Sequence, residues 1–376
     1  MIHRAIKNQI LHDFHKNKII VILGPRQVGK TTLLEDLAAP DRKILFLNCD
    51  DYDDAAQLEG KTSTQLRQLL KGYDWAFIDE AQRVPDIGLT LKKIGDMKLP
   101  TKVVVTGSAS LDIASKVNEP ATGRLIEYNL FPFSLGELAN DTSEKEQARL
   151  ITERMIYGFY PEIVTDPAYA KRTLVNLANN YLYKDIFTYQ GIKKPEVLQK
   201  LVKALALQVG SEVSYDELAQ LIGIDRATVE KYIGLLEKCF IVFRLNSYST
   251  NQRNEIKKGK KVYFYDNGIR NAVISNFAPL ELRNDEGALW ENLIVSERIK
   301  RNAYAGSYAQ LFFWRNTNQQ EIDLIEDCDG LLHAFEFKYN PKKAKASAPK
   351  AFVELYPNTS FQTVTPTNFW PFVALE

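Results

Sequence analysis

The feature that most constrains this chain is a short glycine-bounded turn near its amino terminus. Residues 24–31 read Gly-Pro-Arg-Gln-Val-Gly-Lys-Thr, between an apolar run at 19–23 and a stretch with helical periodicity. Glycine, four residues and then Gly-Lys-Thr, placed between a strand and a helix, is the pattern of a loop that wraps phosphates with backbone N–H groups. The spacing therefore predicts a strand, a tight loop and a helix in immediate succession.

We expect the loop to hold the phosphates of a nucleotide, with ATP and Mg²⁺ as cofactors. Lys30 is expected to reach the β- and γ-phosphates, and Thr31 to offer its hydroxyl to Mg²⁺. The predicted nucleotide-binding residues are Gly24, Pro25, Arg26, Gln27, Val28, Gly29, Lys30, Thr31 and Thr32.

Two later strand ends are predicted to meet this loop. The apolar run at 75–78 ends in Asp79 and Glu80. We expect Asp79 to steady the Mg²⁺ shell and Glu80 to polarise the attacking water, although such a pair can also be a simple helix cap. The run at 103–105 ends in Thr106 and Ser108, either of which could sense the γ-phosphate or merely form a polar strand exit.

Alternation of short apolar runs with helical stretches defines the predicted fold class of the first part. Runs at 43–47, 75–78 and 102–106 lack polar alternation and are separated by helical segments. Strands of this kind belong to a parallel sheet covered on both faces. The first part is therefore predicted to be an α/β domain.

Composition narrows the class of protein without identifying a partner. The 376 residues are 45% hydrophobic and 25% charged, with a net charge of +1. These values are typical of globular chains and exclude a disordered or a small disulfide-stapled protein, while net charge favours neither nucleic acid nor membrane. Three scattered cysteines and the absence of a long apolar stretch lead us to expect a cytoplasmic protein with no membrane partner.

The middle of the chain is predicted to contain a winged helix-turn-helix. Ser214 followed by Glu217 forms a capping-box pattern, and Gly223 fits the turn before a second helix. The candidate recognition helix at 225–238 has three acids and three bases, so its charge does not favour DNA. Its candidate contacts are Arg226, Thr228 and Lys231, and a structural or protein-binding role remains open.

The tail carries an ordered set of chemically active residues. Glu291 lies in a predicted helix, and Asp323, Glu336 and Lys338 lie in predicted strands. This order looks like a restriction-endonuclease core, in which three carboxylates hold Mg²⁺ and a lysine orients water. Glu336 and Lys338 share one strand face, as that core requires. A domain that keeps this fold without the chemistry is the alternative.

Several motifs together resemble a known family. The stretches GPRQVGKTTLL, FIDEAQRVP, TGSAS, TGRLIEYNLFPFSLGEL and YGFYPEI are similar to those of prokaryotic AAA-type ATPases with a carboxy-terminal domain of uncharacterised function. The resemblance implies that Arg124 neutralises charge on the γ-phosphate, from within the subunit or from a neighbour. A surface arginine paired with an acid is the alternative. Asp185 and the segment 157–161 resemble landmarks of a helical lid, although aromatic residues at helical spacing more often belong to a core.

These observations predict a P-loop NTPase sheet with a helical lid, a winged helix-turn-helix and a restriction-endonuclease-like α/β domain. The expected segments are 1–140, 141–200, 201–250 and 251–376. The function expected is that of an ATP-hydrolysing switch or motor that acts on or with DNA. An ATP-gated, Mg²⁺-dependent nuclease and a regulatory ATPase that binds a protein partner in a defence or toxin-control system are the alternatives, and a homo-oligomer remains open.

Overall fold

A computed structural model describes residues 2–108, 123–181, 195–249 and 259–375. The described residues divide into two compact units. Unit 1 comprises Met1–Pro132 and the short segment Lys238–Phe240, and unit 2 comprises the other described residues from Phe133 onward.

Unit 1 is built on a parallel sheet of five strands in the order β2-β3-β4-β1-β5. Each pair of neighbours is parallel, so all five carboxyl ends lie at one edge, where α/β sheets bind ligands. The predicted α/β class and parallel sheet are confirmed for this unit. The strands are β1 Ile19–Leu23, β2 Ile44–Asn48, β3 Trp75–Asp79, β4 Lys102–Gly107 and β5 Leu125–Asn129.

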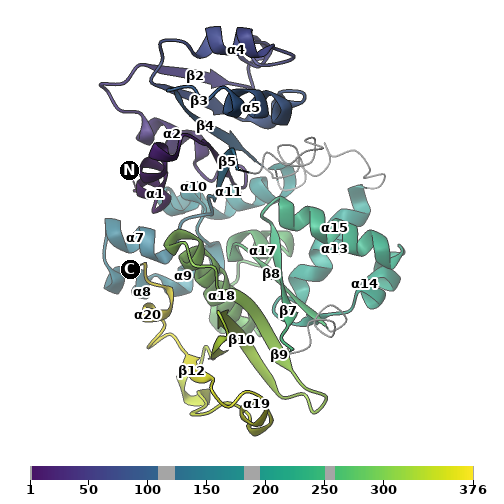
Figure 1. Ribbon diagram of the computed structural model, residues 1–376. Coiled ribbons are helices and arrows are strands. Elements are labelled where there is room, and N and C mark those ends of the chain that lie inside the picture. Colours follow the sequence, from purple (N-terminus) through teal and green to yellow (C-terminus); the bar gives the residue numbers. More distant parts are fainter. Residues whose placement is uncertain (1, 109–122, 182–194, 250–258, 376) are drawn as a thin grey trace. The chain divides into compact units, whose positions relative to one another are not determined.

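Helices connect these strands (Figure 1). The first helix after the glycine-bounded loop buries Leu33, Leu34 and Leu37, and α4 begins with a capping box between Thr62 and Gln65. The helices of unit 1 are α1 Ile6–Asp13, α2 Lys30–Leu37, α3 Tyr52–Ala56, α4 Ser63–Leu70 and α5 Ile87–Asp96, with a 3₁₀ turn, η2, at Ala81–Arg83.

Unit 2 contains a seven-stranded sheet in the order β12-β11-β10-β9-β7-β8-β6. The pairs β11–β12 and β7–β9 are parallel and the others antiparallel, with β9 and β10 forming a long hairpin (Figure 1). The strands are β6 Glu212–Val213, β7 Val242–Ser247, β8 Lys260–Phe264, β9 Gln310–Arg315, β10 Glu321–Cys328, β11 Leu331–Phe337 and β12 Ser360–Val364.

The longest helix described in unit 2, α18, runs for 20 residues and buries polar as well as apolar side chains. The helices of this unit are α7 Leu135–Asp141, α8 Glu144–Arg149, α9 Ile151–Tyr157, α10 Pro161–Thr165, α11 Ala170–Asn176, α13 Pro195–Leu207, α14 Tyr215–Ile222, α15 Arg226–Lys238, α17 Asn267–Val273, α18 Glu286–Ala305, α19 Lys350–Leu355 and α20 Trp370–Val373.

The order α13-β6-α14-α15-β7-β8 places three helices beside three antiparallel strands. Ser214 caps α14, and Gly223 ends it with a φ of +77°. Strand β7 also pairs with β9, so the segments expected at 201–250 and 251–376 contribute to one sheet. The main boundary between the two compact units lies at Pro132, and the four predicted segments stay a prediction.

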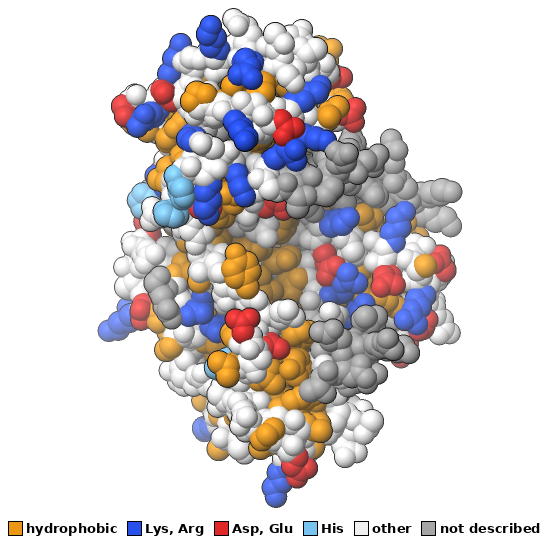
Figure 2. Space-filling model, in the orientation of Figure 1, with side chains coloured by type: hydrophobic (Ala, Val, Ile, Leu, Met, Phe, Trp, Pro, Cys, Tyr) orange, Lys and Arg blue, Asp and Glu red, His pale blue; other side chains and the backbone are white. Residues whose placement is uncertain are grey.

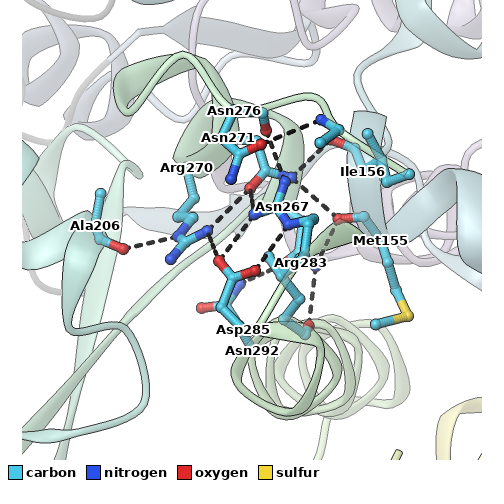
Figure 3. Close-up of polar contacts among 12 residues, drawn as sticks. Met155, Ile156, Ala206, Asn267, Arg270, Asn271, Asn276, Arg283, Asp285 and Asn292 are labelled. Atoms are coloured by element: carbon cyan, nitrogen blue, oxygen red, sulfur yellow. Dashed lines mark hydrogen bonds and ion pairs between the residues drawn. The ribbon is translucent and has the colours of Figure 1, made fainter. Parts of the chain in front are cut away.

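A buried polar network explains why residues after Phe133 form one unit (Figure 3). Asn271 Nδ2 donates to the carbonyl oxygens of Met155 and Ile156, near the end of α9, at 3.2 and 2.8 Å. Asn267 Nδ2 donates to the Met155 oxygen at 3.2 Å and to the Leu289 oxygen of α18 at 2.9 Å. The last carbonyls of a helix need such partners, so α17 joins α9 to α18.

Among the described residues, no helix combines the length and the apolar character needed to cross a membrane.

Candidate nucleotide site and carboxylate cluster

The backbone of the loop after β1 adopts the tight path that its glycines predict. Gly29, at the start of α2, has a φ of +92°, a conformation that favours glycine. A Cβ at Gly24 would lie 2.3 Å from the carbonyl oxygen of Leu130, so no larger residue fits there. The loop leads directly into the amino terminus of α2, where backbone N–H groups and the helix dipole favour an anion.

Lys30 is 4% exposed and reaches back over this loop. Its ammonium donates to the carbonyl oxygens of Gly24 at 3.2 Å and Pro25 at 3.0 Å, and its Nζ lies 3.7 Å from Glu80 Oε1. Two of these three neighbours are uncharged carbonyl oxygens of the loop itself.

Asp79 is 3% exposed, and its carboxylate accepts hydrogen bonds from three other residues of the site. Thr31 Oγ1 donates to Asp79 Oδ2 at 2.6 Å, and the Thr106 hydroxyl donates to Asp79 Oδ1. The backbone N–H of Glu80 donates to Asp79 Oδ1 and Thr106 Oγ1, both at 3.1 Å. Thr106 was a candidate γ-phosphate sensor, whereas in this structure it orients Asp79.

The donors at this strand edge suit a hard cation. The Thr31 hydroxyl and the Asp79 carboxylate are adjacent oxygen ligands, and Mg²⁺ is usually bound by one or two carboxylates together with waters and substrate phosphates. Burial raises the pKa of the neighbouring Cys49 thiol to about 12, and nearby acids add to this effect: Asp54, Asp79, Asp50 and Glu80. The same negative charge favours a bound cation, so Thr31 and Asp79 fit a Mg²⁺ that accompanies a nucleotide.

Gln82, which the sequence analysis did not single out, links two of the candidate residues. Its side-chain nitrogen donates to the carboxylate of Glu80 and, at 3.0 Å, to Ser108 Oγ. Its carbonyl oxygen accepts from the Ser108 N–H at 3.4 Å. Gln82 therefore fixes Glu80 relative to the end of β4. Its position two residues after Glu80 in FIDEAQ was the available sequence signal.

Arg4 is a second residue that sequence reasoning missed. It is 7% exposed, and its guanidinium donates to the carbonyl oxygen of Val28 at 3.4 Å and to that of Phe131. The amino-terminal segment thereby supports the loop from outside. A lone arginine in a helical pattern carries no sequence signal for this role.

Arg124 does not lie with the other candidates. Its carbonyl accepts from the N–H of Ile19 at 3.0 Å, at the amino edge of the sheet, and its guanidinium pairs with Asp96. The phosphate loop follows Leu23 at the opposite edge, about 15 Å away at ~3.3 Å per strand residue. The expectation that Arg124 reaches the γ-phosphate within its own subunit is therefore wrong in this structure, and the ion-paired alternative describes it.

The four tail residues gather around lysines. Lys261 is 1% exposed, and its Nζ lies 3.0 Å from Glu291 Oε1 and 4.0 Å from Asp323 Oδ1, while it also pairs with Glu321. Tyr263 donates to Glu291 Oε1 at 2.7 Å. A protein cation thus sits between two carboxylates expected to hold Mg²⁺.

Glu336 is compensated in a similar way. Its Oε1 accepts from Lys338 Nζ at 2.8 Å and from Lys345 Nζ. Asp323 Oδ2 accepts from the Phe337 N–H at 2.8 Å. In the part of the chain that the structure describes, no group of three acidic, histidine or cysteine side chains is arranged to hold a metal. The predicted three-carboxylate Mg²⁺ site is therefore corrected to a lysine-centred ion cluster, because Lys261 and its neighbours supply the positive charge.

The predicted DNA contacts on α15 are partly engaged within the protein. Arg226 Nη1 pairs with Asp216 Oδ2 at 2.8 Å, and Thr228 Oγ1 donates to Asp225 at 2.7 Å. Lys231 is exposed. Two other candidates, Asp185 and the end of the TGSAS stretch at 109–110, lie outside the described residues.

The first part of the chain is similar to a known protein family. Residues 16–139 match the AAA domain family, residues 148–280 match a domain of unknown function, and residues 286–368 match a second such domain. An uncharacterized protein of Haemophilus influenzae is 25% identical over 370 residues, covering 90% of this chain and 88% of that protein. One of Mycobacterium tuberculosis is 25% identical over 336 residues, covering 86% and 71%. The segment that is similar to the AAA domain family therefore includes the site described above.

Two solved structures show weaker similarity. A Walker-type ATPase of Pyrococcus abyssi is 15% identical, with a TM-score of 0.48 over 73% of this chain and 96% of that one. The ORC1 protein of Aeropyrum pernix, solved in complex with DNA, is 15% identical, with a TM-score of 0.33 over 75% and 95%. Both TM-scores lie below 0.5, so neither similarity defines the fold or the function of this chain.

Proposed function

We propose that this protein is an ATP-hydrolysing AAA-type switch or motor that acts on or with DNA. One observation supports ATP hydrolysis: four residues lie together at the carboxyl edge of the parallel sheet, namely Lys30, Thr31, Asp79 and Glu80. An AAA domain match over 16–139 supports the same part.

Each residue has a distinct role in this proposal. The backbone of residues 24–29 binds the phosphates, and Lys30 exchanges its loop carbonyls for phosphate oxygens. Thr31 and Asp79 hold Mg²⁺, which supplies charge neutralisation when it is bound. Glu80 accepts a proton from the attacking water, while Gln82 positions the Glu80 carboxylate against Ser108.

Action on DNA is supported only by the order of the helices in the second unit. The helices α14 and α15 follow one another as in a helix-turn-helix, but the charges of α15 are balanced and Arg226 is paired with Asp216. Lys261 occupies the carboxylate cluster, which argues against the nuclease alternative. No observation specifically favours a regulatory protein partner.

Glu80→Gln tests the proposed base. Amide nitrogen cannot accept a proton, so phosphate release should slow by about 10²–10⁴-fold while Mg²⁺-ATP affinity stays within about threefold. Phosphate release is measured for the full chain with no DNA and with single- and double-stranded DNA. Glu35→Gln, an exposed substitution on α2, is the matched control and should retain turnover. Normal turnover in Glu80→Gln would exclude Glu80 as the base, and rates independent of every DNA would remove the DNA part.

A further inference from the structure

A second pocket lies in unit 1, at the opposite edge of the parallel sheet from the phosphate loop. Its volume is about 710 Å³, within the ~300–1,000 Å³ range of small-molecule sites. It is lined by the segment before β2, by α4 and the turn that follows it, and by residues directly before β4. None of these residues belongs to the nucleotide site described above.

The lining of this pocket is strongly basic. Its lining contains four cations, Arg42, Arg67, Lys71 and Lys102, and a single acid, Asp74. Outside the lining, Arg42 lies 3.6 Å from the Asp41 carboxylate and Lys102 donates to the Asn17 side chain. The Asp74 carboxylate already accepts from the backbone N–H of Lys43 at 2.9 Å. Within the described part of the chain, Arg67 and Lys71 make no ion pair. Their charge is therefore available to an anion from outside.

Aromatic and apolar groups share the same lining. Tyr73, Trp75, Leu99 and Pro100 contribute, and both aromatic residues are half-buried. Lys43 Nζ lies 5.0 Å from the centre of the Tyr73 ring, and the Phe14 ring packs edge-on against Trp75, so a base would use the remaining aromatic surface. A space-filling view shows Lys and Arg side chains interspersed with hydrophobic ones over unit 1 (Figure 2). An anionic ligand that also carries flat apolar faces matches both properties.

Backbone contacts hold the pocket in shape. The Thr101 hydroxyl donates to the carbonyl oxygens of Leu70 at 3.2 Å and Tyr73 at 2.9 Å. The N–H groups of Asp74 and Trp75 both donate to the Lys43 carbonyl, at 2.9 and 3.3 Å. Because the turn after α4 is tied to both neighbouring strands, the pocket is formed before any ligand arrives, which lowers the entropic cost of binding.

We propose that this pocket binds a single strand of nucleic acid. The phosphates contact Arg67 and Lys71, and an unpaired base packs on the aromatic surface of Tyr73 and Trp75, the combination that single-strand sites use. Bases inside a duplex are already stacked and cannot enter. The inference rests on the nucleic-acid part of the proposed function and gives it a surface outside α15, while ATP binding does not depend on it.

The test measures binding of fluorescein-labelled dT₁₂ to the full chain by anisotropy over a range of salt concentrations. In the double variant Arg67→Ala/Lys71→Ala, affinity should fall at least tenfold. Because each phosphate contact contributes about 0.7 to the slope of log K against log salt on single strands, the slope should shrink by about 1.4. Lys200→Ala/Lys203→Ala removes the same charge from exposed sites on α13 and should bind normally.

Tyr73→Leu separates stacking from charge. It keeps an apolar side chain but removes the ring, so dT₁₂ affinity should fall about 5- to 150-fold with the salt slope unchanged. Calorimetric ATP binding is followed in all variants and should not change, so failure of this inference and failure of the ATPase proposal are distinguishable.

Several results would overturn the inference. Wild-type protein that binds no dT₁₂, or a double variant that binds as well as the control, would remove the pocket as the site. Loss of binding in Lys231→Ala alone would assign nucleic acid to α15. Equal competition by polyglutamate would show that the pocket accepts an acidic protein segment, and equal competition by a duplex would exclude base insertion.

Discussion

The two units each bury a lysine beside carboxylates, but the neighbours of the two ammonium groups differ. Lys30 donates to the neutral carbonyl oxygens of Gly24 and Pro25, and its Nζ lies 3.7 Å from Glu80 Oε1. Lys261 is in contact with Glu291 and Glu321, and Asp323 lies 4.0 Å away. Carbonyl oxygens carry no net charge that would repel an incoming anion, whereas a cation enclosed by acids is already compensated. Lys30 is suited to a ligand and Lys261 to holding the fold.

The largest difference between the two lysines is expected in their contribution to stability, and Lys261→Met tests it. Removing one partner of a buried ion cluster leaves the carboxylates uncompensated, so the free energy of unfolding should fall by about 3–5 kcal/mol. Urea unfolding measures the change. Lys30→Met, of the same shape, should unfold near the wild-type midpoint. If Lys261→Met were as stable as wild type, the cluster would not hold the fold.

A smaller effect, on the pH dependence of stability, is expected from Asp323 in the same cluster. Burial, with the Glu291 charge, raises the pKa of this carboxyl to about 7, well above the ~3.9 of an unfolded aspartate. Between these values the folded chain holds a proton that the unfolded chain has lost. The contribution of Asp323 to the free energy of unfolding is therefore fully present below about pH 4. It falls as pH rises towards 7 and levels off above that pH.

Asp323→Asn removes that proton exchange. The decline in urea midpoint between pH 5 and pH 8 should be shallower in the variant than in wild type. Glu59→Gln, an exposed change in unit 1, is a control that should keep the wild-type slope. Identical slopes in wild type and Asp323→Asn would show that Asp323 titrates as an ordinary exposed aspartate.

The smallest effect is expected at Arg124. Its ion pair with Asp96 is partly exposed, so Arg124→Ala should change the free energy of unfolding by less than about 1 kcal/mol. ATP turnover of dilute protein should be unchanged, because the side chain lies at the edge of the sheet away from the loop. Turnover lost at high protein concentration only would assign Arg124 to a neighbouring subunit. Equal loss at every concentration would contradict its placement within the subunit.

Local patterns predicted the elements that position the nucleotide site. The apolar runs of β1, β3 and β4 and the glycines of the loop are properties of neighbouring residues, so the sequence alone placed Lys30 and Asp79 correctly relative to their strands. Strand β5 was missed because it is an edge strand whose residues are intermediate or exposed, without an apolar run.

The tail was harder to predict because its chemistry depends on tertiary partners. Lys261 precedes the apolar residues of β8 and reads as a surface lysine, yet acids from α18 and β10 enclose it. The contacts of Asn267 and Asn271 to helix carbonyls join segments more than 100 residues apart. Neither arrangement leaves a periodic pattern, so spacing predicted the order of the acidic residues but not the lysine among them.

The proposed function requires the ammonium of Lys30 and the loop around it to bind the phosphates of ATP. Titration calorimetry of Mg²⁺-ATP into wild type and Lys30→Met tests it directly. We predict one site per chain in wild type and an affinity at least about a hundredfold lower in the variant, with the variant still folded. Equal affinity in the two proteins, or no binding by wild type, would contradict the claim.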